Sequence, residues 1–253
     1  MLMPKRTALI VPCYNEEQRL KGQAFLQFLA ETENIDIWFV NDGSSDGTQR
    51  IIDQLSESAP GRIFARGLSE NRGKAEAIRA GVGMVLENEN YDYLGYIDAD
   101  LSAPLEEVLP LNALILEDKH LIVAGSRVKM AGRNIRRTPM RHYISRIFAT
   151  YYSQLLRVHN YDTQCGLKLF TSGFAGQLFA TPFVSRWLFD LELFLRAKKL
   201  IGEPEYARKI IEVPLNEWCE VGESRLKWTD FIKAPAEVLK IYSRYLGSNN
   251  QAS

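Results

Sequence analysis

Hydrophobic runs alternate with amphipathic segments along the first half of the chain. Short runs rich in β-branched and aromatic residues indicate strands at 7–12, 36–41, 62–67, 93–98 and 121–126. Apolar residues recur at helical spacing between them, in the segments 16–32, 46–58, 72–88 and 104–118. Strands that alternate with helices are typical of a mostly parallel sheet flanked by helices. The pattern therefore predicts an α/β fold.

The second half of the chain loses this alternation. Residues 134–158 are rich in arginine and carry apolar residues at helical spacing, which predicts a basic amphipathic helix. The chain after this segment mixes short strands with helices. We expect one domain over 1–246, with a ligand-binding half (1–128), a half that completes the crevice (129–246) and a disordered tail (247–253).

Several polar residues closely follow predicted strands. In a sheet of this kind, ligands bind beyond the carboxyl ends of the strands. The residues in such positions are Tyr14, Asp42, Asp98, Asp100 and Arg127. Packing alone does not explain polar side chains that converge from separate strand ends, so we expect a site there.

The segment Asp98-Ala99-Asp100 places two carboxylates one residue apart. Two such charges repel each other unless a cation lies between them, and Mg²⁺ or Mn²⁺ prefers carboxylate oxygens together with substrate phosphates. The sequence therefore suggests a metal held against a diphosphate. A solvated turn at the strand end, or a helix N-cap before Pro104, explains the same pattern without a metal.

The segments 42–46 and 12–16 also place polar residues directly after predicted strands. Asp42 follows a hydrophobic strand and precedes Gly43, which allows close backbone approach, so we assign Asp42 to a ligand and Asp46 to helix capping. Pro12 and Tyr14 follow the first strand, with Glu16 near the expected helix start. An acidic first turn favoured by the helix dipole would explain Glu16 alone.

Lys74 lies in the glycine-containing segment 71–81, which lacks the spacing of a Walker A phosphate loop. At the first turn of a predicted helix, this side chain is either a solvated lysine or a nucleotide contact.

Taken together, the segments 11–20, 40–48, 71–81, 96–104 and 124–127 resemble glycosyltransferase family 2 enzymes with the GT-A fold. The resemblance implies a nucleotide-sugar donor whose base and ribose contact Pro12, Tyr14, Glu16 and Asp42. It also implies that Asp98 and Asp100 ligate Mg²⁺ or Mn²⁺ on the diphosphate. Ala99, Lys74 and Arg127 complete the expected donor site.

The segments 162–170, 186–199 and 213–228 are similar to those of dolichyl-phosphate β-glucosyltransferases and related polyprenyl-phosphate glycosyltransferases. This resemblance implies inverting transfer of a hexose, with glucose from UDP-glucose preferred, to a polyprenyl phosphate. Arg127, Arg141 and Arg225 are then expected to hold the acceptor phosphate, with Arg137 a weaker candidate, because guanidinium binds phosphate bidentately.

Asp162 and Asp190 are the candidate catalytic carboxylates, and Arg225 is placed with them. A phosphate acceptor is already largely ionised near neutrality and needs no base, whereas a hydroxyl acceptor needs one. Asp162 is the preferred candidate for the catalytic carboxylate, because Asp190 could instead anchor a buried network with Arg186. A transferase acting on a glycan hydroxyl and a non-catalytic nucleotide-sugar-binding protein stay open as alternatives.

Composition narrows the partners and the compartment. Lys+Arg and Asp+Glu are equal at 31 each, so bulk charge gives no support for a nucleic-acid partner. Three separated cysteines (Cys13, Cys165 and Cys219) argue against a disulfide framework and favour the cytoplasm. With no spanning segment or signal peptide in the sequence, we expect the basic segment 134–158 to bind an anionic membrane surface peripherally, on its cytoplasmic face.

Overall fold

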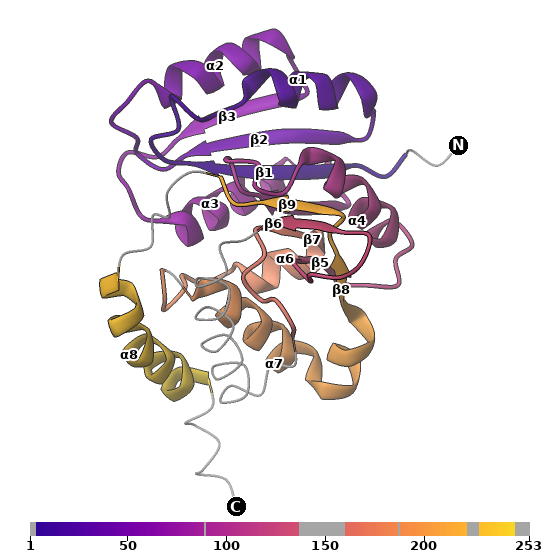
Figure 1. Ribbon diagram of the computed structural model, residues 1–253, viewed down its shortest axis with the longest axis vertical. Helices are drawn as coiled ribbons and strands as arrows, with labels where there is room; N and C mark the ends of the chain where they lie inside the picture. Colours follow the sequence, from indigo (N-terminus) through magenta and orange to yellow (C-terminus); the bar gives the residue numbers. More distant parts are fainter. Residues whose placement is uncertain (1–3, 89, 137–159, 187, 222–227, 246–253) are drawn as a thin grey trace, which may run out of the picture.

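A computed structural model describes residues 4–88, 90–136, 160–186, 188–221 and 228–245, of which 228–234 are described by their backbone alone. Its main sheet has seven strands in the order β3-β2-β1-β4-β7-β5-β8 (Figure 1). Their bounds are β1 Thr7–Cys13, β2 Ile35–Asn41, β3 Ile63–Gly67, β4 Tyr93–Ile97, β5 Ile122–Ser126, β7 Leu167–Thr171 and β8 Ile210–Pro214. All neighbouring strands are parallel except β7, which runs antiparallel to β4 and to β5. The predicted α/β class and the mostly parallel sheet are confirmed.

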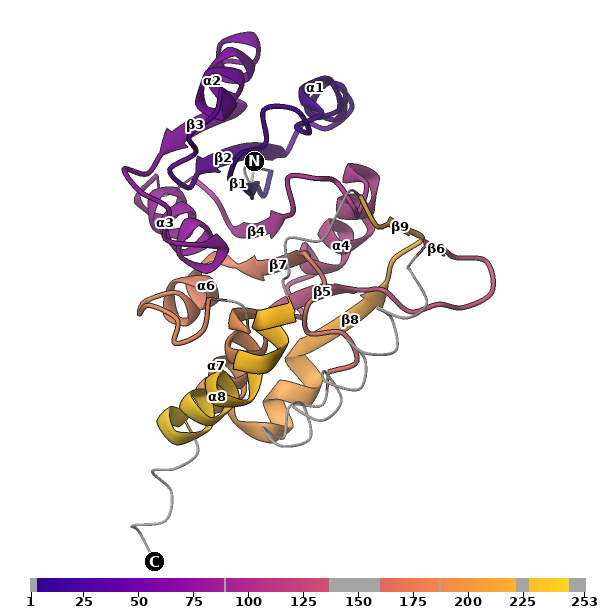
Figure 2. The same cartoon turned by 60° about the vertical axis from the view of Figure 1, so that its left-hand side comes forward.

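Helices cover both faces of this sheet, with α1 and α4 on one side and α3 and α6 on the other (Figure 2). The helix bounds are α1 Gly22–Glu31, α2 Thr48–Ser58, α3 Lys74–Glu87, α4 Val108–Ile115, α6 Ser172–Leu178, α7 Phe189–Lys209 and α8 Trp228–Tyr245. A short 3₁₀ helix, η1 (Leu105–Glu107), precedes α4. After β7 the chain mixes the helices α6, α7 and α8 with short strands, as the sequence predicts.

The inner strands β1, β2, β4, β5 and β7 are buried on both faces, which explains their continuous hydrophobic runs. Successive residues of β1 enter different cores: Ala8 and Ile10 pack in the cluster that contains α3, α6 and α7, whereas Leu9 and Val11 pack with α1, α2 and α4. This alternation follows from the two-residue period of a strand. The sheet is thereby fixed in position, and the loops at its carboxyl edge have a rigid base.

The second half of the chain enters the same sheet. The segment 167–171 inserts between β4 and β5, and Tyr96 pairs with Lys168 in that register. Both halves therefore share one hydrogen-bonded sheet.

Helix α7 includes a break at Gly202, which has φ 76° and precedes Pro204.

Two predicted helices differ from the observed structure. Residues 134–136 form strand β6 (Asn134–Arg136), which pairs in parallel with β9 (Glu217–Cys219), so the helix predicted from residue 134 was wrong at its beginning. Cross-strand pairing outcompetes the weak helical pattern there. Residues 137–159 of the predicted basic helix lie outside the described part, as does the predicted tail 247–253.

Helix α1 begins at Gly22 rather than at residue 16. Asn15 has a positive φ of 50°, and the amides of Arg19 and Leu20 both donate to the Glu16 carbonyl, which forms a separate turn. Glu16 is therefore in a loop six residues before the helix, and the interpretation of it as a helix-dipole residue was wrong.

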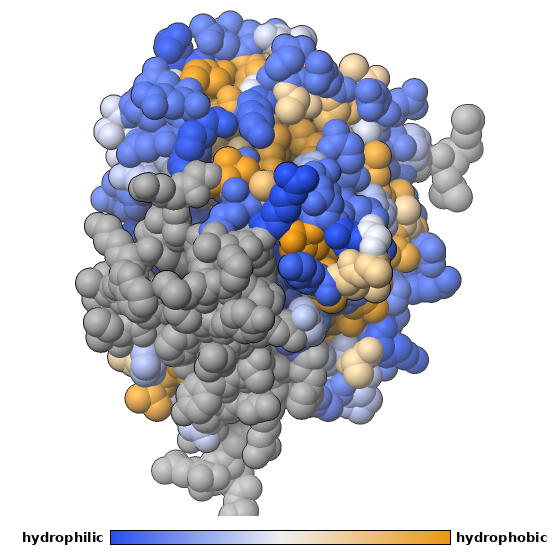
Figure 3. All heavy atoms as spheres, viewed as in Figure 1, coloured by the Kyte–Doolittle hydropathy of each residue, from blue (hydrophilic) through white to orange (hydrophobic). Residues whose placement is uncertain are grey.

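Hydrophilic residues cover much of the outer surface over α1 and α2, and hydrophobic residues reach the surface between them (Figure 3). Among the described residues, no helix is both long enough and apolar enough to cross a bilayer.

Candidate active site

The loops that follow β1 and β2 are joined by reciprocal hydrogen bonds. Asn15 Oδ1 accepts from the amide of Ser45 at 2.9 Å, and the amide of Glu16 donates to Thr48 Oγ1 at 2.8 Å. Asp46 accepts from the amide of Thr48, the first residue of α2, at 3.0 Å, but the N-cap position itself is occupied by Gly47, so the predicted N-cap role of Asp46 was wrong. These contacts bring Tyr14 and the half-buried Pro12 to the carboxyl edge of the sheet.

Asp42 is buried and holds the loop that precedes α3. Its two carboxylate oxygens accept hydrogen bonds from the amides of Arg72 (2.8 Å) and Gly73 (2.7 Å). Gly73 adopts φ 93°, a left-handed conformation that favours glycine. The predicted ligand contact of Asp42 stays a prediction, because the carboxylate already organises this loop.

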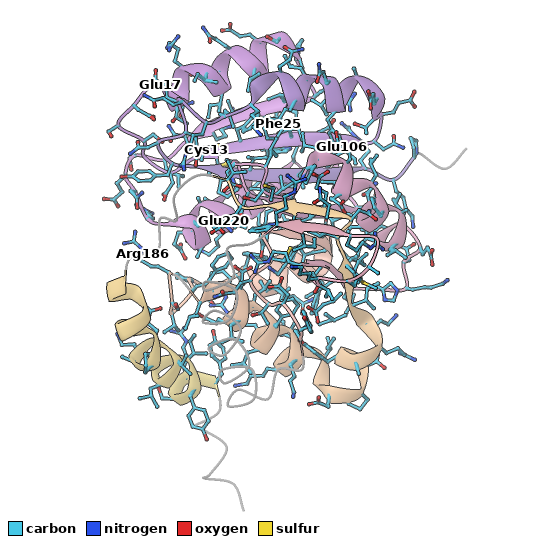
Figure 4. All side chains as sticks on the ribbon, in the orientation of Figure 1. Cys13, Glu17, Phe25, Glu106, Arg186 and Glu220 are labelled. Atoms are coloured by element: carbon cyan, nitrogen blue, oxygen red, sulfur yellow. The ribbon has the colours of Figure 1, made fainter. Side chains whose placement is uncertain are left out.

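Arg186 holds the same loop from the other side. Its guanidinium donates to the carbonyl of Arg72 (3.0 Å) and to the carbonyl of Asn71 (3.3 Å). Figure 4 shows Arg186 at the rim of the molecule, near the beginning of α3. The predicted pairing of Arg186 with Asp190 was wrong, because this arginine binds backbone carbonyls of the loop instead.

Asp98 and Asp100 follow β4 directly. The amide of Ser102 donates to Asp100 Oδ1 at 2.9 Å, so a turn does form at the strand end. Burial and the neighbouring negative charge of Asp98 nevertheless raise the pKa of Asp100. The two carboxylates are therefore close enough to repel each other, as the sequence predicts for a metal pair.

Gly166 lies against the Asp98 carboxylate. The register pairs Ile97 with Leu167, so the next residues, Asp98 and Gly166, come opposite each other. A β-carbon built on Gly166 would overlap Asp98 Oδ2. Only glycine leaves room for the carboxylate in this place.

Lys74 is the first residue of α3 and pairs with Asp98. Its Nζ lies 2.5 Å from Asp98 Oδ1. Burial alone would lower the pKa of Lys74, but the carboxylates of Asp98, Asp190 and Asp100 outweigh this effect and raise it. Lys74 is therefore an ion-paired, partly exposed lysine rather than a solvated one, and its predicted nucleotide contact stays a prediction.

The donor atoms fit a divalent cation that is shared with a phosphate ligand. Asp98 and Asp100 offer carboxylate oxygens, the hard ligands that Mg²⁺ and Mn²⁺ take, and a cation between them would relieve their repulsion. Within the described part of the chain, no group of three His, Cys, Asp or Glu side chains could hold a metal. Phosphate oxygens and water would have to complete the coordination.

Glu16 lies in the same electrostatic environment. Burial raises its pKa to about 7, Arg19 opposes this increase, and the negative charge of Asp100 adds to it. The Arg19 guanidinium lies 3.1 Å from Glu16 Oε2. Glu16 is therefore close to Asp100, and its role in a donor site stays a prediction.

Arg127 and Asp162 form a bidentate pair. The Nε and Nη2 atoms of Arg127 each donate to one Asp162 oxygen at 2.7 Å, and the Arg127 amide donates to Asp162 as well, at 2.9 Å. The guanidinium carbon also lies 5.3 Å from the centroid of the Trp218 ring. Burial opposes ionisation of Arg127, but Asp162, and to a lesser degree Asp98, raise its pKa.

Asp190 is engaged by a buried lysine. Its Oδ1 accepts from Lys168 Nζ at 2.6 Å and from the Tyr96 hydroxyl at 2.5 Å. The side chain of Lys168 has no exposed surface. The prediction of a buried network around Asp190 was right in kind, but its partners are Lys168 and Tyr96.

A second set of contacts connects the segment 216–219 to residues 102–107, which follow β4. The amide of Cys219 donates to the carbonyl of Ser102 at 2.8 Å. Buried Glu107 accepts from the amides of Asn216 (3.0 Å) and Glu217 (2.8 Å). Sequence reasoning missed Glu107, because nothing in its local pattern distinguishes it from a surface carboxylate.

Lys168 and Gly166 were also missed. A lone lysine inside the apolar run 167–170 was an available signal for a buried ion pair.

Cys165 is buried, and burial together with Asp162 raises the pKa of its thiol to about 11, which agrees with a packing role. The predicted acceptor arginines Arg137, Arg141 and Arg225 lie outside the described residues.

A mostly parallel seven-stranded sheet flanked by helices is the fold of the GT-A class of α/β glycosyltransferases. The chain belongs to glycosyl transferase family 2, because the model of that family matches residues 8–179. The resemblance predicted from the sequence is thus confirmed, and so is a nucleotide-sugar glycosyltransferase as the class of enzyme.

Curated relatives extend the similarity to nearly the whole chain. A dolichyl-phosphate beta-glucosyltransferase of Trichomonas vaginalis is 32% identical over 249 residues, covering 93% of this chain and 70% of the relative. The dolichyl-phosphate beta-glucosyltransferase of Dictyostelium discoideum is 30% identical, covering 94% and 74%. The similarity therefore includes the acceptor-side half.

Solved structures share the fold. The glucosyl-3-phosphoglycerate synthase of Mycobacterium tuberculosis, in complex with Mn²⁺, UDP-glucose and phosphoglyceric acid, has a TM-score of 0.66 and 15% identity, covering 96% of this chain and 80% of that chain. The complex with UDP alone has a TM-score of 0.65 and 15% identity, covering 94% and 80%. At this identity the likeness supports the GT-A fold alone.

Proposed function

We propose that this chain is an inverting, metal-dependent glucosyltransferase that transfers glucose from UDP-glucose to dolichyl phosphate or a related polyprenyl phosphate. The relatives above are named for the dolichyl-phosphate reaction. The observation that carries the proposal is that both candidate bases, Asp162 and Asp190, are paired with cationic side chains. Asp162 accepts two hydrogen bonds from the Arg127 guanidinium, and Asp190 forms an ion pair with buried Lys168.

A hydroxyl acceptor would need a carboxylate that can take its proton, a contribution of roughly 10² to 10⁴ in rate. Asp162 and Asp190 are instead committed to cations. A phosphate monoester needs no such base, because its second pKa is about 6 and it is largely dianionic near neutrality. Ionised phosphate oxygen can attack the anomeric carbon directly, while the bond to the nucleoside diphosphate breaks with inversion.

On the donor side, Asp98 and Asp100 would hold Mg²⁺ or Mn²⁺, which stabilises the negative charge that develops on the leaving diphosphate. Lys74 adds a positive charge next to these carboxylates. Pro12, Tyr14, Glu16 and Asp42 are proposed for the base and ribose, since they lie at the carboxyl edge of the sheet, where Glu16 is close enough to Asp100 for that charge to raise its pKa. Residues 1–128 thus supply the donor half of one proposed domain.

On the acceptor side, Arg127 is proposed to attract the acceptor phosphate. Its guanidinium lies close enough to Asp98 for that carboxylate to raise its pKa, so an anion next to Arg127 would be near the metal pair. Asp162 and Trp218 orient the guanidinium from two sides. Arg141 and Arg225 are proposed as further phosphate ligands on the resemblance alone.

A peripheral position on the cytoplasmic face of a membrane suits a lipid-linked acceptor. Helix α8 exposes Leu239 (63%) and Tyr242 (40%), which lie three residues apart on one face, and Lys240 and Arg244 are also exposed. Apolar side chains next to basic ones are typical of helices that bind anionic lipid surfaces. Flotation with phosphatidylserine vesicles tests this position, and loss of binding in Leu239→Glu is the expected result.

Transfer itself is tested with radiolabelled UDP-glucose, Mn²⁺ and dolichyl phosphate in detergent. The wild-type chain should yield label that extracts into organic solvent and is released by mild acid. Asp100→Ala should abolish it, whereas Glu106→Ala, which removes an exposed carboxylate of η1, should not. Label that enters only a water-soluble glycan, or metal-dependent UDP binding without transfer to any acceptor, would refute the proposal.

A further inference from the structure

Lys74 occupies the side of Asp98 that a metal would need. Its Nζ lies 2.5 Å from Asp98 Oδ1, so an ammonium group already neutralises one carboxylate of the proposed metal pair. A metal on the same oxygen would be repelled by the ammonium at close range. Binding of a metal through Asp98 Oδ1 is therefore favoured when Lys74 moves away.

Aromatic rings determine where the ammonium can lie. Lys74 Nζ is 5.8 Å from the centroid of the Tyr96 ring and 5.7 Å from that of the Phe189 ring. A cation within about 6 Å of a ring face is attracted by the ring. Both rings are buried, so they hold Lys74 near the site even when its contact with Asp98 breaks.

Helix α7 fixes these rings. Asp190, next to Phe189, accepts from the Tyr96 hydroxyl and from Lys168, whose Nζ is 5.2 Å from the centroid of the Tyr96 ring. Lys168, Asp190, Lys74 and Asp98 thus form a series of alternating charges that leads from the core to the carboxyl edge. The series balances charge in the protein without a metal.

We propose that Lys74 is an exchangeable counterion that couples metal binding to nucleotide binding, an inference that rests on the proposed function. Without nucleotide, a metal that takes Asp98 separates the ammonium from its ion-pair partner, so metal alone binds weakly. The diphosphate of the donor offers Lys74 new oxygen partners. Metal and nucleotide consequently bind with positive cooperativity, and the coupling is equal in both directions.

The Lys74→Met variant tests this exchange because it keeps the length of the side chain and removes the charge. Titration with Mn²⁺ alone, followed by electron paramagnetic resonance, should show about twofold to fivefold tighter binding than in the wild type, the range expected for a partly exposed ion pair. The affinity for UDP at saturating Mn²⁺ should fall. The ratio of the Mn²⁺ dissociation constants without and with UDP should therefore shrink.

Lys119→Met is the matched control. Lys119 pairs with exposed Glu117 in the connection that leads into β5, at the opposite edge of the sheet. This variant changes the net charge equally and should bind Mn²⁺ and UDP as the wild type does. If Lys74→Met does not fold by circular dichroism, Lys74→Gln carries the same expectations.

Unchanged or weaker binding of Mn²⁺ alone by the Lys74 variant would overturn the exchange, while the proposed function would stand. If the wild type binds no Mn²⁺ even with UDP, the metal assignment fails together with the exchange. The two failures are thus distinguished by the wild-type titration.

Discussion

The Arg127 guanidinium donates two hydrogen bonds of 2.7 Å to the Asp162 carboxylate, one to each oxygen. The two residues are 35 positions apart and meet where β5 ends. Their side chains are 17% and 11% exposed, so the pair is largely removed from water. Both were predicted as site residues, one for phosphate and one for chemistry, and the structure makes them a single unit.

Asp162→Asn should destabilise the fold as well as reduce transfer. The substitution leaves the Arg127 charge without its partner in a largely buried place, which costs about 3 kcal/mol when a buried pair is broken. Urea unfolding measures the loss. Adding Arg127→Met should restore part of the stability, because it removes the stranded charge, although it should not restore transfer. Wild-type stability of Asp162→Asn with complete loss of transfer would indicate a catalytic base instead.

Gly166→Ala should abolish Mn²⁺-dependent UDP binding while the protein still folds. The new β-carbon overlaps Asp98 Oδ2, so the carboxylate must move away from its position beside Asp100. Calorimetric titration of UDP with Mn²⁺ and with EDTA measures the effect. Gly173→Ala is the control, since a β-carbon at Gly173 in α6 meets nothing within 4 Å. Equal affinities in both alanine variants would contradict the predicted position of Asp98.

Glu16→Gln should change how stability depends on pH. Burial raises the pKa of Glu16 from 4.5 to about 7, so between these values the folded protein binds more protons than the unfolded chain. The free energy of unfolding therefore falls as pH rises through this window, by about 2 to 3 kcal/mol for this group. The glutamine variant cannot ionise and should show a smaller decrease. Urea unfolding at pH 5 and pH 8 compares the two, and identical slopes would refute the assignment.

Glu107→Gln should loosen the connection between β8 and β9. The carboxylate accepts from two backbone amides, and the amide group of glutamine would direct donors toward one of them. Loss of a buried hydrogen bond of this kind costs about 1 to 3 kcal/mol. Hydrogen exchange at Asn216 and Glu217 should accelerate more than at β1. Unchanged protection there would show that the connection is held by other contacts.

The local pattern of the sequence was sufficient for β1 to β5 and for the helices between them. Hydrophobic period and chain order are local properties, and a parallel sheet brings the ends of its strands to one edge. Asp98, Asp100, Asp42 and Tyr14 were placed at that edge for this reason. The first turn of α1 was misplaced because Asn15 and Glu16 form a turn with the loop after β2, a contact between distant segments.

What the sequence by itself determined was the α/β class, the carboxyl-edge site and the family, because these depend on periodicity and on short motifs. Only the tertiary structure decided the partners of each charge. The antiparallel return of β7 places Lys168 opposite Tyr96 and Gly166 beside Asp98, and this register depends on pairing between segments some 70 residues apart. The sequence left Asp162 and Asp190 as candidate catalytic carboxylates, with a buried network as the alternative for Asp190. In the structure they pair with Arg127 and Lys168, because burial of a charge requires an opposite charge nearby.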